Sequence, residues 1–360
     1  MGGKELEYVT EAFEQNWIAP VGPGIEAFEH DLELFLGGQV HVAAMNSGTA
    51  AMHLALILAG VGSGDVVLCQ SLTFCATANP ILYQGARPVF VDSENESWNI
   101  DPNLLKQAIE EETKKGRKPK AVIAVHLYGM PAQWDEIANL CKAHHIPLIE
   151  DAAEALGATY KDRPCGSLGD YAILSFNGNK IISCGGGGAL VCQNQEDKAK
   201  AIYLASQAKS VAAHYEHEAL GYNYRLSNVL ACIGRGQMEV LPERIRQKRE
   251  VNTNYRKLLE NTDVIFLNER SDTFSNYWLT TILCPTYELR ERIRLAMAQE
   301  NIECRPIWKP MHLQSLYRDA GQYVQGCSQN LFERGLCLPS GTAMTTSHWE
   351  RIEAVLRALL

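Results

Sequence analysis

One lysine of the sequence stands where its amine could take part in chemistry. Lys180 follows the apolar run YAILSF and precedes the glycine run Gly185–Gly188. It is the only charged residue between Tyr171 and Gln195. A solvated surface charge is the ordinary alternative for a lone lysine. A lysine amine in a semi-enclosed site, however, has a lowered pKa and forms Schiff bases with carbonyl compounds, so Lys180 is a candidate nucleophile.

Two carboxylates follow an apolar run in the segment IPLIEDAAE. Asp151 and Glu154 stand at the end of this run, and a buried carboxylate there needs a cation or hydrogen-bond donors. Asp151 could simply cap a following helix. It could also be the anion that keeps a pyridinium nitrogen protonated, as pyridoxal phosphate (PLP) sites require. Asp151 and Lys180 are 29 positions apart, which leaves room for one helix and one strand and predicts that both lie at the same sheet edge.

Three further segments could contact an anion or a planar ring. Asn46–Thr49 stands between HVAAM and a helix expected from Ala50, where it could cap that helix or bind a phosphate. Phe74 follows another apolar run and could belong to the core or stack on a cofactor ring. The segment GYNYRLSN is either a helix-entry loop or a site where Arg225 binds a phosphate or carboxylate.

The segment Arg305–His312, RPIWKPMH, concentrates cations and an aromatic residue between prolines, so it is either a packed loop or an anion and sugar contact. His214 and His217 offer no third ligand at zinc spacing, and we predict no metal site. The glycines of Gly60–Gly64 follow a helical pattern and not a strand, and no Walker A sequence occurs.

The elements that would position these residues form an α/β pattern. From about residue 41 to 192, short apolar runs alternate with helical patterns, which indicates a mainly parallel sheet covered on both faces. Ligands of such sheets bind at the carboxyl ends of the strands. We place a boundary near Pro242, so that residues 1–242 form a large domain with an N-terminal helical segment and residues 243–360 a smaller α/β domain.

Composition excludes several classes of protein. The 360 residues carry a formal net charge of -9, which argues against a general nucleic-acid binder. The eleven cysteines are scattered with no C-x-x-C, so we expect free thiols in a reducing compartment. No signal peptide or apolar run of about 20 residues occurs. We therefore expect a cytoplasmic protein without a membrane partner.

Seven segments in order along the chain resemble the DegT/StrS family of PLP-dependent nucleotide-sugar aminotransferases. They are NSGTAAMHLAL, SLTFCATANPILYQGARPVFVD, VHLYGMP, IEDAAEALGA, SFNGNKII with GGGGALV, GYNYRLSN and RPIWKPMH. SFNGNKII, EDAAEALG and RPIWKPMH are most similar to the branch that aminates a UDP-linked 4-keto-6-deoxy-N-acetylglucosamine-type sugar in bacillosamine biosynthesis.

The resemblance implies a fold-type-I PLP enzyme that works as a homodimer with active sites at the subunit interface. Lys180 matches the lysine that holds the cofactor, and Asp151 matches the partner of its pyridinium nitrogen. Other implied cofactor contacts are Gly48, Thr49, Phe74, Glu154 and Ser175, with Asn223 and Arg225 from the other subunit. The position of Glu154 is Gln, His or Glu in the family. Implied substrate contacts are Asn179, Arg305, Trp308, Lys309 and His312.

The implied reaction transfers an amino group from L-glutamate to the C4 ketone of the UDP-linked sugar, giving a 4-amino sugar for glycan biosynthesis. The alternatives are an aminotransferase for a differently linked sugar or an amino acid, and a catalytically silent PLP-binding regulatory protein. The family's sugar dehydratases replace the lysine with histidine, so Lys180 excludes that form. Relatives often carry a short segment before the position of MGGKE, and its loss could remove a substrate contact without affecting the fold.

Overall fold

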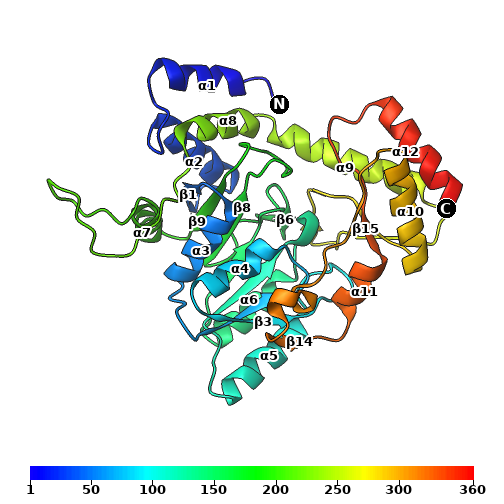
Figure 1. Ribbon diagram of the computed structural model, residues 1–360, viewed down its shortest axis with the longest axis horizontal. Coiled ribbons are helices and arrows are strands. Elements are labelled where there is room, and N and C mark those ends of the chain that lie inside the picture. Colours follow the sequence, from blue (N-terminus) through cyan, green and yellow to red (C-terminus); the bar gives the residue numbers. More distant parts are fainter.

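A computed structural model describes all 360 residues, and its centre is an eight-stranded sheet (Figure 1). The strand order is β1-β9-β8-β5-β4-β2-β3-β14. All neighbouring strands are parallel except those that pair with β9, which is antiparallel to both β1 and β8. The strands are β1 His41–Met45, β2 Val66–Gln70, β3 Arg87–Val91, β4 Ala121–Val125, β5 Leu148–Asp151, β8 Tyr171–Ser175, β9 Gly188–Cys192 and β14 Gly321–Tyr323.

Helices cover both faces of this sheet because its strands are apolar at nearly every position. In β2, Val67 and Cys69 belong to the core cluster under α3 and α4, whereas Val66 and Leu68 belong to the cluster under α5 and α6. Successive side chains of a strand point to opposite faces, so a run without alternation is buried on both sides. The helices of this part are α1 Glu5–Glu14, α2 Pro23–Phe35, α3 Gly48–Leu58, α4 Cys75–Tyr83, α5 Pro102–Lys114, α6 Trp134–Ala143, α7 Gln195–Ala205 and α8 Asn228–Met238.

The long helix α9, Leu241–Leu258, runs from the large sheet to a C-terminal unit (Figure 1). There a small sheet of order β10-β12-β15-β13 packs with α10 and α12 around the residues that form a separate core cluster. Its elements are β10 Ile265–Phe266, β12 Thr281–Leu283, α10 Tyr287–Gln299, β13 Arg305–Pro306, α11 Cys327–Arg334, β15 Gly335–Cys337 and α12 Thr346–Leu359. A third sheet joins β6 Thr159–Tyr160, β7 Arg163–Pro164 and β11 Thr273–Phe274.

These observations confirm the predicted α/β class with a mainly parallel, doubly covered sheet. The segment between Asp151 and Lys180 differs from the expected one helix and one strand, because it contains β6, β7 and β8 but no helix. The sequence analysis also missed β14, which comes after the predicted boundary and yet pairs with β3 at the edge of the large sheet. The boundary near Pro242 remains a prediction. All eleven cysteines are free, and none of the helices combines the length and apolar character needed to cross a membrane.

Candidate active site

A cavity of about 1030 Å³ opens at the carboxyl ends of the parallel strands. The turns after β1, β2, β5 and β8 line one side of it, and the C-terminal unit lines the other. Ten residues singled out from the sequence lie in its wall: Gly48, Thr49, Phe74, Asp151, Glu154, Ser175, Asn179, Lys180, Arg305 and Trp308. The fold therefore gathers residues that are up to 260 positions apart in the chain into one space.

Lys180 lies in the loop between β8 and β9, and its side chain is largely buried, with 12% exposed. Its Nζ donates a hydrogen bond to Oε1 of Glu154 at 3.3 Å. The same Nζ stands 4.2 Å from the centre of the Trp278 ring, within the range of a cation–π interaction. The Lys180 amine is thus held between a carboxylate and an aromatic face.

Glu154 follows β5 and is almost completely buried. Its Oε2 accepts the backbone N–H of Tyr128 at 2.7 Å. Burial raises the pKa of Glu154 to about 7, although the charge of Lys180 acts in the opposite direction. Its carboxyl group can therefore exchange a proton near neutral pH beside the Lys180 amine.

We expect Glu154→Gln to change how stability depends on pH in the cofactor-free protein. The pKa of Glu154 in the folded protein lies above the usual 4.5 of a glutamate. The contribution of Glu154 to stability is therefore complete below pH 4.5 and is lost as the pH rises through about 7. The wild type should lose about 3 kcal/mol relative to the glutamine variant between about pH 5 and about pH 8. Thermal midpoints of both proteins across this range test the prediction. Parallel pH curves for the two proteins would contradict it.

Asp151 is the last residue of β5, and its carboxylate is bound by neutral donors only. Oδ2 accepts the hydroxyl of Thr77 at 2.7 Å, and Oδ1 accepts the N–H of Ala153 at 3.2 Å. Thr73 in turn lies 2.7 Å from the Thr77 hydroxyl. Burial raises the pKa of Asp151, and no cation of the chain forms an ion pair with it. A cationic ring nitrogen in the cavity would supply the missing partner.

The turn between β1 and α3 forms a cradle for an anion. Ser47 caps α3 by accepting the N–H of Ala50 at 3.1 Å, while first-turn N–H groups have no acceptor within a helix. A side chain at Gly188 would place its Cβ 2.3 Å from the nitrogen of Gly48, so only glycine lets the strand β9 approach this turn. Ser175 lines the cavity at the same place. These groups suit a phosphate.

Aromatic side chains form a continuous wall on the side of the C-terminal unit. The rings of Phe74 and Trp308 are 5.4 Å apart, and Trp308 lies 5.1 Å from Tyr128. Tyr128 stacks on Trp278 at 6.3 Å. Phe74 remains half-exposed within the cavity, where a planar ring could pack against it.

Four predicted contacts do not line the cavity of a single chain. The guanidinium of Arg225 is held by Oε1 of Glu29 at 2.7 Å and by the carbonyl of Ala44 at 2.9 Å. Asn223 is exposed, and its carbonyl accepts a hydrogen bond from Asn46. The assignment of Asn223 and Arg225 to a second subunit's site remains a prediction.

Lys309 and His312 are the other two predicted contacts outside the cavity. Lys309 is exposed, and Nδ1 of His312 lies 2.6 Å from the hydroxyl of Ser71. The chain turns away from the cavity after Trp308, because the N–H of Met311 donates to the carbonyl of Ser71 at 2.8 Å. The assignment of Lys309 and His312 as substrate contacts remains a prediction.

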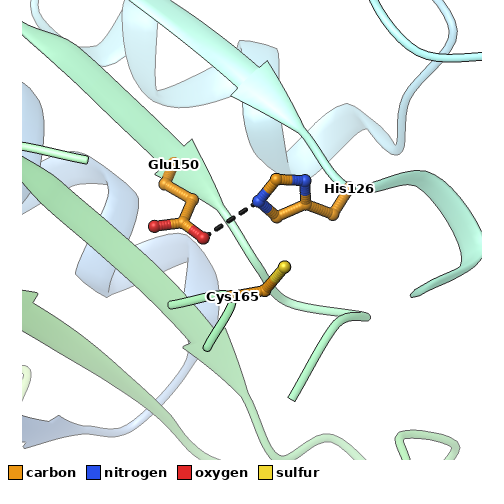
Figure 2. A group of neighbouring side chains, drawn as sticks. All are labelled: His126, Glu150 and Cys165. Atoms are coloured by element: carbon orange, nitrogen blue, oxygen red, sulfur yellow. Dashed lines mark hydrogen bonds and ion pairs between the residues drawn. The ribbon is translucent and has the colours of Figure 1, made fainter. Parts of the chain in front are cut away.

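A buried group of potential metal ligands, His126, Glu150 and Cys165, lies outside the residues that line the cavity (Figure 2). Nε2 of His126 and Oε1 of Glu150 are 2.9 Å apart, and Nδ1 of His126 accepts the N–H of Ala132 at 3.0 Å. Glu150 also accepts three backbone N–H groups, from Gly166, Leu168 and Gly169. Burial raises the pKa of the nearby Cys165 thiol. These contacts account for the group as a hydrogen-bonded structural cluster.

Sequence reasoning missed three residues that shape the cavity. Thr77 lies in the segment CATANPILY, Trp278 in WLTTILC and Lys248 in the charged segment PERIRQKRE. The structure brings all three to the cavity wall. Of the three, only Thr77 could have been found from its local sequence. It lies three positions after Phe74, on the first turn of α4, where its hydroxyl is close to the carboxyl end of β2.

Gly129 shows how the C-terminal unit is fitted to the site. Its φ is +88°, and a Cβ there would lie 1.9 Å from Oδ1 of Asn276. We expect Gly129→Ala to cost about 2 to 4 kcal/mol of folding free energy, through both the clash and the backbone strain. Gly116, with φ +74° and no neighbour for a Cβ, is the matched control and should cost only about 1 kcal/mol as alanine. Denaturant titration measures both, and equal costs would contradict the close fit.

Comparison with known proteins agrees with this geometry. The family model of the DegT/DnrJ/EryC1/StrS aminotransferases matches residues 1–357. This chain belongs to that family. It is 49% identical to the putative pyridoxal phosphate-dependent aminotransferase EpsN of Bacillus subtilis, over 99% of this chain and 93% of that protein. It is 38% identical to the GDP-perosamine synthase of Escherichia coli O157:H7, over 94% and 90% of the two chains.

A solved structure of a family member from Brucella abortus superimposes with a TM-score of 0.92, at 26% identity over 99% of this chain and 95% of that one. The protein is therefore a sugar aminotransferase, and its cofactor is pyridoxal phosphate. The cavity fits this group chemically. It offers an amine at Lys180, a buried carboxylate without an ion-pair partner at Asp151, and the first-turn N–H groups of α3 beside Ser175 for a phosphate.

Proposed function

We propose that this aminotransferase moves the amino group of L-glutamate to the C4 ketone of a nucleotide-linked 4-keto-6-deoxy sugar, giving the 4-amino sugar. The observation that carries the proposal is the position of Lys180, Asp151 and Glu154 in one cavity of about 1030 Å³ at the carboxyl ends of the strands. Such a volume is large enough for a cofactor together with part of a nucleotide sugar.

The cofactor, when bound, supplies a carbonyl that accepts the amino group and a cationic ring that withdraws electrons from the donor's α-carbon. Asp151 holds the negative charge that matches the ring nitrogen, and Thr77 fixes the orientation of its carboxylate. Gly48, Thr49 and Ser175, which line the cavity at the start of α3, would hold its phosphate. Phe74 would pack against its ring.

Lys180 moves the proton in this proposal. Its Nζ, once free, takes a proton from the donor's α-carbon as a positioned general base, and later returns a proton as a general acid. Glu154, 3.3 Å away, accepts a hydrogen bond from the charged form of the amine. The ring of Trp278 covers this amine on the side of the C-terminal unit, and only 12% of the Lys180 side chain is exposed.

The substrate contacts on the cavity wall are Asn179, Arg305 and Trp308 in this proposal. Asn179 and Arg305 are exposed, which leaves both free to meet a ligand that enters from solvent. Arg305 pairs with Glu303 at 2.5 Å and would exchange this partner for a phosphate. Because the chain has a net charge of -9, the positive charge of Arg305 would be needed locally to offset the charge of a diphosphate.

As the amino acceptor, we propose a UDP-linked 2-acetamido-2,6-dideoxy-4-keto-hexose, because the segments SFNGNKII, EDAAEALG and RPIWKPMH suggest it. A GDP-linked 4-keto sugar is the second candidate, because the GDP-perosamine synthase of Escherichia coli O157:H7 is 38% identical to this chain. Both candidates share the reacting ketone and differ in the base and in the substituent at C2.

Kinetics with UDP-, GDP- and dTDP-linked 4-keto-6-deoxy sugars, each with L-glutamate as donor, test this assignment. We expect kcat/KM for the UDP-linked 2-acetamido sugar to exceed that of the others by about 10²-fold, as differential pocket contacts allow. A preference for the GDP-linked sugar would replace the first candidate with the second. No amination of any of these sugars would contradict the proposed function.

We also propose that the protein works as a homodimer, with Asn223 and Arg225 near the phosphate of the partner's site. The segment between α7 and α8 projects away from the body of the molecule at the left of Figure 1. It exposes Val211, Tyr215 and Leu220 almost completely, which an aqueous surface does not favour. Light scattering measures the mass in solution, and a monomer at assay concentration would contradict this arrangement.

A further inference from the structure

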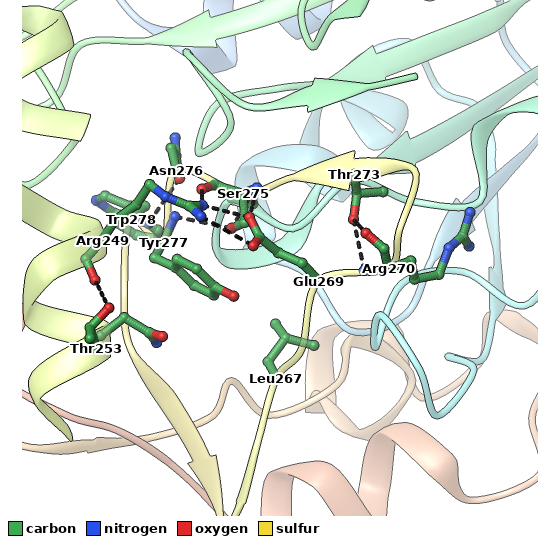
Figure 3. Close-up of polar contacts among 12 residues, drawn as sticks. Arg249, Thr253, Leu267, Glu269, Arg270, Thr273, Ser275, Asn276, Tyr277 and Trp278 are labelled. Atoms are coloured by element: carbon green, nitrogen blue, oxygen red, sulfur yellow. Dashed lines mark hydrogen bonds and ion pairs between the residues drawn. The ribbon is translucent and has the colours of Figure 1, made fainter. Parts of the chain in front are cut away.

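The four-residue segment Ser275–Trp278 crosses from the C-terminal unit to the wall of the active-site cavity (Figure 3). All four residues are buried. The segment precedes β12 and has no regular secondary structure of its own. Its position is therefore set by side-chain contacts, and these come from two sides.

From the side of α9, two neighbouring cations hold the ends of the segment. The guanidinium of Arg249 donates to the carbonyl of Ser275 at 2.5 Å and pairs with Glu269. The Nζ of Lys248 donates to the carbonyl of Trp278 at 2.9 Å and to that of Ser340 at 2.6 Å. Lys248 is buried without a carboxylate partner, and burial lowers its pKa to about 8. An uncharged lysine amine still donates two hydrogen bonds. Lys248 can therefore keep its contacts with the carbonyls of Trp278 and Ser340 whether or not it is protonated.

From the side of the large sheet, the same segment is tied to the residues around Glu154. The amide of Asn276 donates to the carbonyls of Glu154 at 2.8 Å and Leu156 at 2.9 Å. The hydroxyl of Ser275 donates to the carbonyl of Gly129 at 2.8 Å. Oδ1 of Asn276 then accepts the N–H of Trp278 at 2.8 Å. One amide side chain thereby fixes the backbone of Glu154 and of Trp278 relative to each other.

Trp278 makes two contacts with the loop between β8 and β9, which carries Lys180. Its Nε1–H donates to the carbonyl of Asn179 at 2.7 Å, which fixes the residue before Lys180. Its ring lies under Nζ of Lys180 at 4.2 Å. A cation–π interaction of this kind stabilises an ammonium and not a neutral amine.

We propose that Trp278 is a positioning residue for Lys180, which sets where the free amine lies and favours its charged form. During the proposed reaction, Nζ of Lys180 becomes an ammonium when it takes a proton from the donor's α-carbon, and the Trp278 ring stabilises that state. The hydrogen bond to Asn179 keeps the amine from swinging away before the proton is returned. This inference rests on the proton-carrying role of Lys180 in the proposed function, but it does not depend on which sugar is aminated.

The test measures the reactivity of Lys180 in the full chain freed of cofactor. An amine-acylating reagent is applied, and mass spectrometry of the peptide that contains Lys180 gives the rate. Only the neutral amine reacts, so loss of a ring that stabilises the ammonium should raise the rate in Trp278→Leu about fivefold at about pH 8. At about pH 11, where lysine amines are mostly neutral, the rates of variant and wild type should converge.

Trp278→Phe keeps an aromatic face and should raise the rate at about pH 8 by less than twofold, which also provides a result if the leucine variant fails to fold. Trp349→Phe is the control, because Trp349 packs on Tyr255 in the C-terminal unit and not on the cavity. A rate in Trp278→Leu equal to that of the control would overturn the proposal. So would an increase of the same size at both pH values, which would show that the ring only blocks access of the reagent. If only the phenylalanine variant folds, a rise of fivefold or more in it would also overturn the proposal.

Discussion

Lys180→Ala should abolish amino transfer while leaving the protein folded. The amine of Lys180 lies beside Glu154 in the cavity, and it combines the roles of cofactor anchor and proton carrier. We expect kcat to fall by about 10⁴-fold or more, because general acid–base catalysis alone contributes up to about that factor. Coupled detection of 2-oxoglutarate, formed from L-glutamate, measures the loss.

Lys142→Ala is the matched control for this variant. Lys142 is an exposed lysine on α6, away from the cavity, so its removal should leave both turnover and stability unchanged. A small amine added to the assay should restore part of the proton transfer in Lys180→Ala. Retention of more than about 1% of wild-type turnover would show that another group carries the proton, since that loss is below the usual range for a general base.

Asp151→Asn is expected to have the second largest effect. Asparagine keeps the shape and the hydrogen bond to Thr77 but removes the charge that a cationic ring nitrogen needs. We expect kcat to fall by about 10³-fold, comparable to the loss of one preorganised electrostatic group in other active sites. Rates with saturating cofactor separate this effect from weaker cofactor binding.

Thr77→Val is a milder change at the same carboxylate and is compared with Asp151→Asn. It leaves the Asp151 charge in place and removes only one of its two hydrogen bonds, so turnover should fall by about tenfold, the equivalent of roughly 1.4 kcal/mol for a bond to a charged group. If Asp151→Asn were no worse than Thr77→Val, the carboxylate would be acting as a hydrogen-bond acceptor only and not through its charge.

The residues that follow strands were predictable because one local rule places them. The carboxyl ends of parallel strands meet at one edge, and this rule put Asp151, Phe74 and Lys180 in the same cavity. The antiparallel insertion of β9 between β1 and β8 did not disturb it, because Gly187 and Gly188 lie at the start of β9 and so at the same edge.

The residues that the C-terminal unit contributes to the cavity could not be predicted by this rule. Trp278 reaches Lys180 only through a set of contacts from α9 and from the turn after β5, and none of these is local in sequence. Lys309 and His312 share a cation-rich segment with Arg305 and Trp308, yet the hydrogen bond of Met311 to Ser71 turns them away from the cavity. Residue type suggested ligand contacts along the whole segment, and the direction of the chain decides which of its residues line the cavity.

Transfer of nitrogen from ¹⁵N-labelled L-glutamate to a UDP-linked 2-acetamido-4-keto-6-deoxy sugar tests the central claim most directly. The product's nitrogen-15 is located at C4 by NMR, and the same reaction is run with Lys180→Ala. The proposed function predicts a labelled 4-amino sugar with the wild type and none with the variant. Formation of 2-oxoglutarate with no label in the sugar, or equal labelling by the variant, would contradict it.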